Sequence, residues 1–149
     1  METAILEGES MKKILVAHDG SKYAQKALKK AMEMAVQFEA TLVVLSVIPE
    51  LHLTELTPLD QVRLKEALEQ EAKKNLAKAK AQLKKKSVAS RMVVGQGNAA
   101  EVILETARKM RVGLIVVGSH GRHGVERFLL GSVSTNVVEH ADRPVMVVK

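Results

Sequence analysis

The chain has 149 residues, a net charge of +6 and no cysteine, and this length favours a single domain. Apolar residues make up 46% but aromatic residues only 2%, which argues against a stacking platform for single-stranded nucleic acid. Without cysteine, disulfides and Cys-based zinc sites are excluded. The first ten residues do not have the pattern of a signal peptide, and no apolar run approaches the roughly 20 residues that span a bilayer. We therefore expect a cytoplasmic protein with no membrane partner.

The excess positive charge is concentrated in one stretch. Seven lysines and no acidic residue lie between Lys73 and Lys86. Such a stretch fits the solvated face and end of a long helix, where cations complement the helix dipole. The alternative is a patch that binds nucleic acid. Because no recognition motif accompanies the lysines, nucleic acid is the disfavoured partner.

In chain order, short apolar runs alternate with segments of helical periodicity. The second helix begins with Thr57 as its N-cap and Pro58 at its first position. Its apolar stripe comprises Leu59, Val62, Leu68, Ala72, Leu76, Ala79 and Leu83. A turn is expected at 95–97. The expected strands are 13–17, 41–48, one within 87–94, 112–117 and 145–148, and the helices are 21–38, 57–85, one from Asn98, and 132–140.

Alternating strands and helices predict an α/β fold with right-handed crossovers. We expect a three-layer α/β/α domain over residues 12–149, with an open five-stranded parallel sheet in the order 3-2-1-4-5, Rossmann-like, after a mobile tail at 1–11. Ligands bind such sheets at the carboxyl ends of the strands, where the strand order reverses. The loops after the first and fourth strands, 17–21 and 118–124, are therefore expected to meet at a ligand site.

The second of these loops is rich in glycine. Gly121 allows a close approach of the backbone to a ligand, and the segment 131–134 begins a helix whose free N–H groups suit a phosphate. The hydroxyl groups of Ser132 and Ser134 are expected to act as further donors. The segment is neither a Walker A loop nor a dinucleotide fingerprint. From composition alone, a phosphate site and simple turn glycines remain equally open.

The spacing of Gly118, Gly121, Gly131 and Ser132 matches G-x2-G-x9-G-[S/T]. This pattern resembles the nucleotide signature of the universal stress protein family, in its ATP-binding type. The segments KKILVAHDGS, TLVVLSVIPE and GQGNAAEVI also resemble the family, so the likeness covers Lys12 to Lys149. The resemblance implies a fold like that of the adenine nucleotide α-hydrolases.

The resemblance also implies roles for individual residues. Asp19 would lie near the adenine or the ribose, and the backbone of Val47 would meet the adenine. Gly118 and Gly121 would line the ribose and phosphates, and residues 131–134 would hold the phosphates. The nucleotide-binding set is Ala17, Asp19, Val47, Gly118, His120, Gly121, Arg122, Gly131, Ser132, Val133 and Ser134.

Histidines and arginines near this loop have two interpretations. His120 would contact phosphate or a metal, or act in proton transfer, or it would merely make a hydrogen bond or face solvent. Arg122 would neutralise phosphate charge or belong to the ordinary surface. His18 is expected at the rim of the site. No catalytic residue and no cluster with metal-ligand spacing stands out, so Mg²⁺ or Mn²⁺ would bind through the phosphates.

The function that follows is a stress-response switch or sensor that binds ATP, ADP or AMP, with at most slow hydrolysis. The alternatives are a nucleotide hydrolase or transferase on the same fold, and an interaction module for another small ligand. The last strand, 145–148, is an apolar edge that tends to pair. The family resemblance likewise implies a homodimer through this strand, acting on an unknown protein partner.

Overall fold

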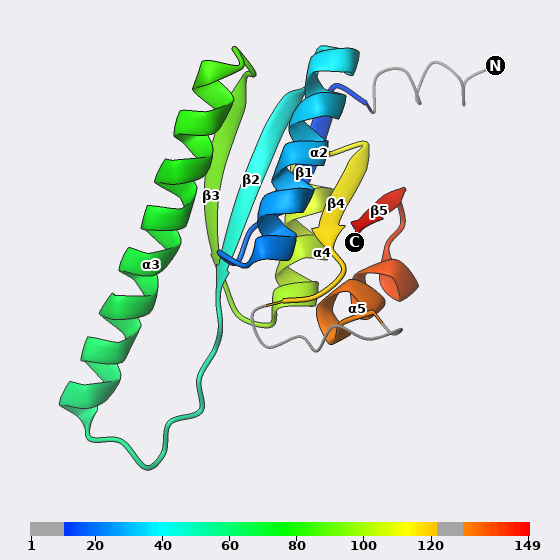
Figure 1. The fold of residues 1–149 in the computed structure, drawn as a ribbon. Helices are drawn as coiled ribbons and strands as arrows, with labels where there is room; N and C mark the ends of the chain where they lie inside the picture. Colours follow the sequence, from blue (N-terminus) through cyan, green and yellow to red (C-terminus); the bar gives the residue numbers. More distant parts are fainter. Residues whose placement is uncertain (1–10, 122–129) are drawn as a thin grey trace.

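The computed structural model describes residues 11–121 and 130–149. Strands and helices alternate along the chain as the sequence predicts (Figure 1). The strands are β1 (Lys13–Ala17), β2 (Thr41–Ile48), β3 (Ser90–Gln96), β4 (Leu114–Gly118) and β5 (Val145–Val148). The helices are α2 (Lys22–Phe38), α3 (Pro58–Lys85), α4 (Ala99–Met110) and α5 (Ser132–His140). In the described ranges, no helix has the length and apolar character to cross a membrane.

The five strands form one sheet in the order β3-β2-β1-β4-β5. Every neighbouring pair is parallel. β1 lies at the centre, and β3 and β5 lie at the edges. The expected fold class and strand order are therefore confirmed.

Helices cover both faces of the sheet. α2 and α3 pack on one face, around Ile14, Val16 and Leu28. α4 and α5 pack on the other face, around Leu15 and Ile103. Because residues on both faces of the central strands are buried, these strands read as continuous apolar runs in the sequence.

Three helix starts are fixed by side chains that the sequence marks as caps. The Oγ of Ser21 accepts from the N–H of Ala24 at 3.1 Å, and the Oγ1 of Thr57 accepts from the N–H of Asp60 at 3.2 Å. The Oδ1 of Asn98 accepts from the N–H of Glu101 at 3.1 Å. These local signals therefore set the starts of α2, α3 and α4.

One expected turn is wrong. Gly95 and Gln96 belong to β3, where Gly95 pairs with Val47 of β2. A Cβ on Gly95 would lie 2.4 Å from the Cγ1 of Val102, so the glycine allows α4 to pack closely on the strand. β4 also differs from the expected 112–117, because it begins at Leu114 and includes Gly118.

Only part of the apolar stripe of α3 is buried. The residues that pack in the core are Ala72, Leu76, Ala79 and Leu83. Leu59 and Val62, nearer the start of the helix, are more than half exposed. The reason is visible in Figure 1, where the first half of α3 extends beyond the lower edge of the sheet. The lysines at 73–86 are all exposed, as expected for a solvated face.

Candidate functional site

A cavity of about 660 Å³ lies at the carboxyl ends of β1, β2 and β4. This is the lower edge of the sheet in Figure 1, and it is the edge at which ligands bind in open α/β sheets. Arg122 lies outside the described residues. The other ten residues predicted to bind nucleotide all line this cavity: Ala17, Asp19, Val47, Gly118, His120, Gly121, Gly131, Ser132, Val133 and Ser134.

The loop after β1 is held by hydrogen bonds within the loop and to β2. The N–H of His18 donates to the carbonyl oxygen of Leu45 at 2.8 Å, and its Nδ1 accepts from the N–H of Gly20 at 3.1 Å. The Oδ1 of Asp19 accepts from the N–H of Ser21 at 2.9 Å. His18 is only 7% exposed, so it forms part of the cavity wall and not the rim.

The imidazole of His18 is neutral in this arrangement, because its Nδ1 is an acceptor. Burial lowers the pKa of His18, while a hydrogen bond with Gln25 and the charge of Asp19 oppose that effect. Burial disfavours the charged form of a base. Protonation of His18 would also remove the acceptor that fixes Gly20.

The loops after β1 and β4 meet as predicted. A Cβ on Gly121 would lie 3.1 Å from the Oδ2 of Asp19. Gly118 has a different reason for being glycine: a Cβ there would lie 2.9 Å from both the carbonyl carbon and the Cβ of Tyr23. Gly118 therefore allows α2 to pack against β4, in addition to lining the cavity.

The start of α5 opens on the same cavity. Gly131 is the N-cap and has no side chain that could bond to the helix. Its N–H donates to the carbonyl oxygen of Ser119 at 2.7 Å. Since an uncapped first turn leaves N–H groups for another acceptor, and the helix dipole is positive there, this end suits an anion.

The two serines of α5 differ. Ser134 is buried, and its Oγ lies 3.0 Å from each of the carbonyl oxygens of Ser119 and Gly131. Its one hydroxyl proton is thus engaged within the protein, and the hydroxyl would have to leave these carbonyl oxygens to donate to a phosphate. Ser132 is exposed at the cavity.

His120 lies in the cavity wall, where its ring makes a hydrogen bond. Its Nδ1 lies 2.9 Å from the Oγ of Ser119, and its ring centroid lies 5.0 Å from that of Tyr23. The N–H of Ser119 donates to the carbonyl oxygen of Val148 at 2.8 Å. The loop after β4 is therefore tied to the edge strand β5.

α3 supplies a wall that the sequence analysis missed. Glu71 and Asn75 line the cavity together with apolar residues of the same helix. The Nδ2 of Asn75 lies 2.9 Å from the position of a Cβ on Gly20, so helix and loop are in close contact. The rest of this wall is largely apolar, and an apolar wall with few polar groups is typical of small-molecule sites.

No metal centre is preformed in the part of the chain that the structure describes, where no three His, Asp or Glu side chains come together. Asp19 is the carboxylate at the loop after β1 that lines the cavity.

The model of the universal stress protein family matches residues 11–149. The chain belongs to the universal stress protein family. It is 34% identical to the universal stress protein MJ0531 of Methanocaldococcus jannaschii, over 100% of this chain and 89% of the relative. It is 35% identical to the universal stress protein YxiE of Bacillus subtilis, over 92% of this chain and 98% of the relative. The solved structure of MJ0577, from the same archaeon as MJ0531, is 32% identical, has a TM-score of 0.81, and the match covers 94% of this chain and 96% of that chain.

More distant relatives of this fold have been solved with adenine nucleotides. One is a universal stress protein in complex with cAMP, at 22% identity and a TM-score of 0.69, with 94% of this chain and 98% of that chain covered. Another is a family protein of Arabidopsis thaliana with AMP bound, at 19% identity and a TM-score of 0.69, with 93% and 91% covered. At these identities the likeness to this chain is one of fold.

Proposed function

We propose that this universal stress protein binds an adenine nucleotide, with ATP as the first candidate, and acts in the cytoplasm as a homodimeric stress-response switch or sensor. The observation that carries the proposal is the single cavity shared by the Asp19 loop, the Gly118–Gly121 loop and the start of α5. The adenine nucleotides bound to relatives of the same fold support the choice of ligand.

The phosphates would bind at the start of α5. The segment 131–134 has no side-chain cap, and helix N-termini bind phosphate through free N–H groups and the dipole. The exposed Ser132 would add a hydroxyl donor. Mg²⁺ or Mn²⁺ would bind through the phosphates and water, as Mg²⁺ usually does. The carboxylate of Asp19, on the loop after β1, would lie on the same cavity.

The base would lie at the end of β2. Val47 lines the cavity there, and α3 closes this side with Asn75 and apolar residues. The groups that would hold a ligand are thus distributed around the cavity.

Phosphoryl transfer would require, in addition to these binding groups, a positioned nucleophile and strong charge stabilisation. For this reason we propose at most slow hydrolysis.

Calorimetry with ATP, ADP and AMP tests the proposal. Gly121→Val places a branched side chain beside Asp19 in the cavity and is expected to abolish binding. Ala81→Val, exposed on α3 and outside the cavity, is the matched control and should bind as the wild type does. Absence of binding by the pure wild-type protein would overturn the proposal. Mass spectrometry of the nucleotide released on denaturation identifies the resident species.

The enzymatic alternative depends on His120, which is fixed at the cavity wall by Ser119 and Tyr23. A hydrolase would release phosphate from ATP at a steady rate well above background, and His120→Ala would abolish that release. A switch would show little turnover, and His120→Ala would change affinity more than rate.

The proposed dimer would form through β5, which, within residues 11–121 and 130–149, pairs only with β4. The carbonyl oxygen of Pro144 accepts from Ile115 of β4, and that of Val148 accepts from Ser119, directly after β4. By strand alternation the N–H of Val147 therefore points to the free edge. Val147→Pro is expected to yield a monomer in sedimentation while keeping the β4–β5 ladder. Since Ser119 bonds to β5, nucleotide binding and dimerisation are expected to be coupled.

A further inference from the structure

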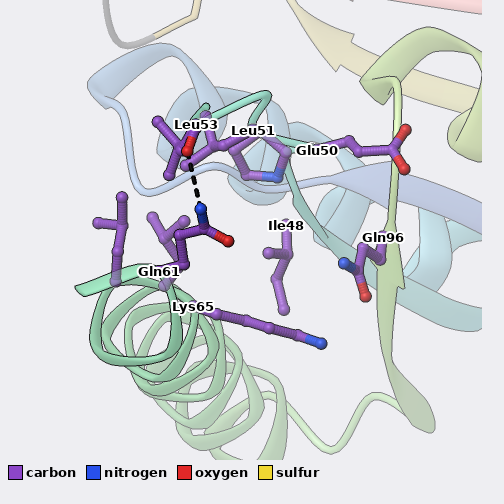
Figure 2. Close-up of a pocket in the computed structure, with 10 residues that line it drawn as sticks. Ile48, Glu50, Leu51, Leu53, Gln61, Lys65 and Gln96 are labelled. Atoms are coloured by element: carbon purple, nitrogen blue, oxygen red, sulfur yellow. Dashed lines mark hydrogen bonds between the residues drawn. The ribbon is translucent and has the colours of Figure 1, made fainter. Parts of the chain in front are cut away.

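A second, smaller cavity adjoins the nucleotide cavity. This annex lies between the segment 48–53, the first turns of α3 and Gln96 of β3, and has a volume of about 170 Å³ (Figure 2). The two cavities share the lining residues Ile48, Pro49 and Leu51. The annex therefore continues the base side of the nucleotide cavity, directly after Val47.

Hydrogen bonds from α3 to the loop after β2 form one wall of the annex. The Nε2 of Gln61 donates to the carbonyl oxygen of Leu53 at 2.8 Å, which is the dashed line in Figure 2. It also lies 3.1 Å from the carbonyl oxygen of Leu56. One side chain of α3 thus fixes the loop that follows β2, so the annex has a defined wall.

The sheet order sets the direction in which a ligand would reach the annex. The phosphate end of the nucleotide cavity lies at α5, after β4, on one side of the central strand. The annex lies at β2 and β3, on the other side of that strand. A nucleotide that binds by its phosphates at α5 therefore points its base toward the annex.

The lining of the annex favours an apolar group of about the size of one ring. Its apolar lining includes Ile48, Leu53 and Leu64. The polar residues that line it are all exposed and are labelled in Figure 2: Glu50, Gln61, Lys65 and Gln96. A cavity of about 150 Å³ can hold a benzene molecule. We propose that the annex binds a ring-sized apolar substituent on the base of an adenine nucleotide, attached at N6, the edge of the base that lies away from the ribose. This inference rests on the proposed nucleotide site.

The test compares ATP with N6-benzyl-ATP by calorimetry on the full chain. Burial of a phenyl-sized group supports at least a tenfold gain in affinity, so N6-benzyl-ATP is expected to bind about tenfold more tightly than ATP. Leu64→Trp fills the annex, because Leu64 lines it and does not line the nucleotide cavity. This variant should lose the tenfold gain and bind ATP as the wild type does.

Leu59→Trp is the matched control, since Leu59 lies on the same helix, is 59% exposed and lines neither cavity. It should keep the preference for the benzyl analogue. If Leu64→Trp does not fold, Leu53→Phe makes the same test from the loop side. Binding of ATP with rejection of the analogue, or a preference that survives both annex variants, would overturn the annex alone. Failure of ATP itself to bind would overturn the nucleotide site and the annex with it.

Discussion

The two ends of the cavity are built in different ways. At the β4–α5 end, backbone contacts backbone: the N–H of Gly131 bonds to Ser119, and Gly118 lies against the backbone of Tyr23. At the β2–α3 end, side chains from distant segments form the wall, and the exposed Leu51 and Leu56 lie in the adjoining loop. The first end is tightly packed, whereas the second has a spare volume beside it.

In the proposed nucleotide site, this difference would separate recognition of the phosphates from recognition of the base. Backbone N–H groups at a helix start can hold any phosphate and need glycines at fixed positions, so they leave a motif in the sequence. A wall made of α3 side chains would contact the rest of the proposed ligand, and such a wall needs no fixed spacing in the sequence. We therefore expect substitutions of the tightly packed residues at the β4–α5 end to affect folding strongly, and substitutions at the β2–α3 end to affect affinity more selectively.

The largest effect is expected for Gly118→Ala. The new Cβ would lie 2.9 Å from the carbonyl carbon of Tyr23, and because this contact is with backbone, α2 must move away from β4. Overpacking of this kind costs about 1–3 kcal/mol in the free energy of unfolding, which urea denaturation measures. Among the described residues, the Cβ of Gly121→Ala would meet only the side chain of Asp19, and this variant should be far milder. Equal unfolding midpoints for the two variants would contradict the packing role of Gly118.

The two serines of α5 sharpen the comparison within one helix turn. Ser134→Ala removes hydrogen bonds to buried carbonyl oxygens and should lower the free energy of unfolding by about 1 kcal/mol, with little change in ATP affinity. Ser132→Ala should leave unfolding unchanged and weaken ATP binding. Urea denaturation and calorimetry on both variants decide the point. The reverse assignment would show that Ser134 turns toward the ligand.

At the other end, Asn75→Ala tests the α3 wall. The amide lines the cavity beside Gly20, and loss of one hydrogen bond to a ligand weakens binding by about two- to tenfold. Stability should change little, because alanine is a better helix former than asparagine. Lys78→Ala, exposed on the same helix, is the control in the same calorimetric titration. Unchanged ATP affinity in Asn75→Ala would show that the Asn75 amide makes no hydrogen bond to the ligand.

The contrast between the two ends also explains what the sequence could predict. Strand and helix alternation, the caps at Ser21 and Thr57, and the glycine spacing are local patterns, and local patterns yielded the fold and the cavity's β4–α5 end. The part played by Asn75 depends on how α3 lies across the sheet, which no local pattern encodes. Likewise, helical periodicity placed Leu59 in an apolar stripe, but it cannot show that the sheet ends before the helix does.

The role of Gly118 shows a related limit. The glycine pattern located the residue correctly at the cavity, yet a motif does not distinguish a glycine that admits a ligand from one that admits a neighbouring helix. Only the contact with Tyr23 makes that distinction. The same holds for Gly95, which the sequence placed in a turn and the structure places in a strand against α4.

The smallest expected effect concerns His18, which lies on the central strand's loop between the two ends. Its pKa is lowered in the fold chiefly by burial, so the unfolded chain takes up the proton first as the pH falls. The contribution of neutral His18 to stability is therefore complete above about pH 6.5, the ordinary histidine value, and is lost progressively below it.

His18→Asn tests this pH dependence, because asparagine retains an acceptor for the N–H of Gly20 but does not titrate. Urea denaturation at pH 7.5 and 5.5 should show that the wild type loses more stability on acidification than His18→Asn. The other four histidines are common to both proteins, so they cancel in the difference, and equal losses would mean that His18 keeps its ordinary pKa in the fold.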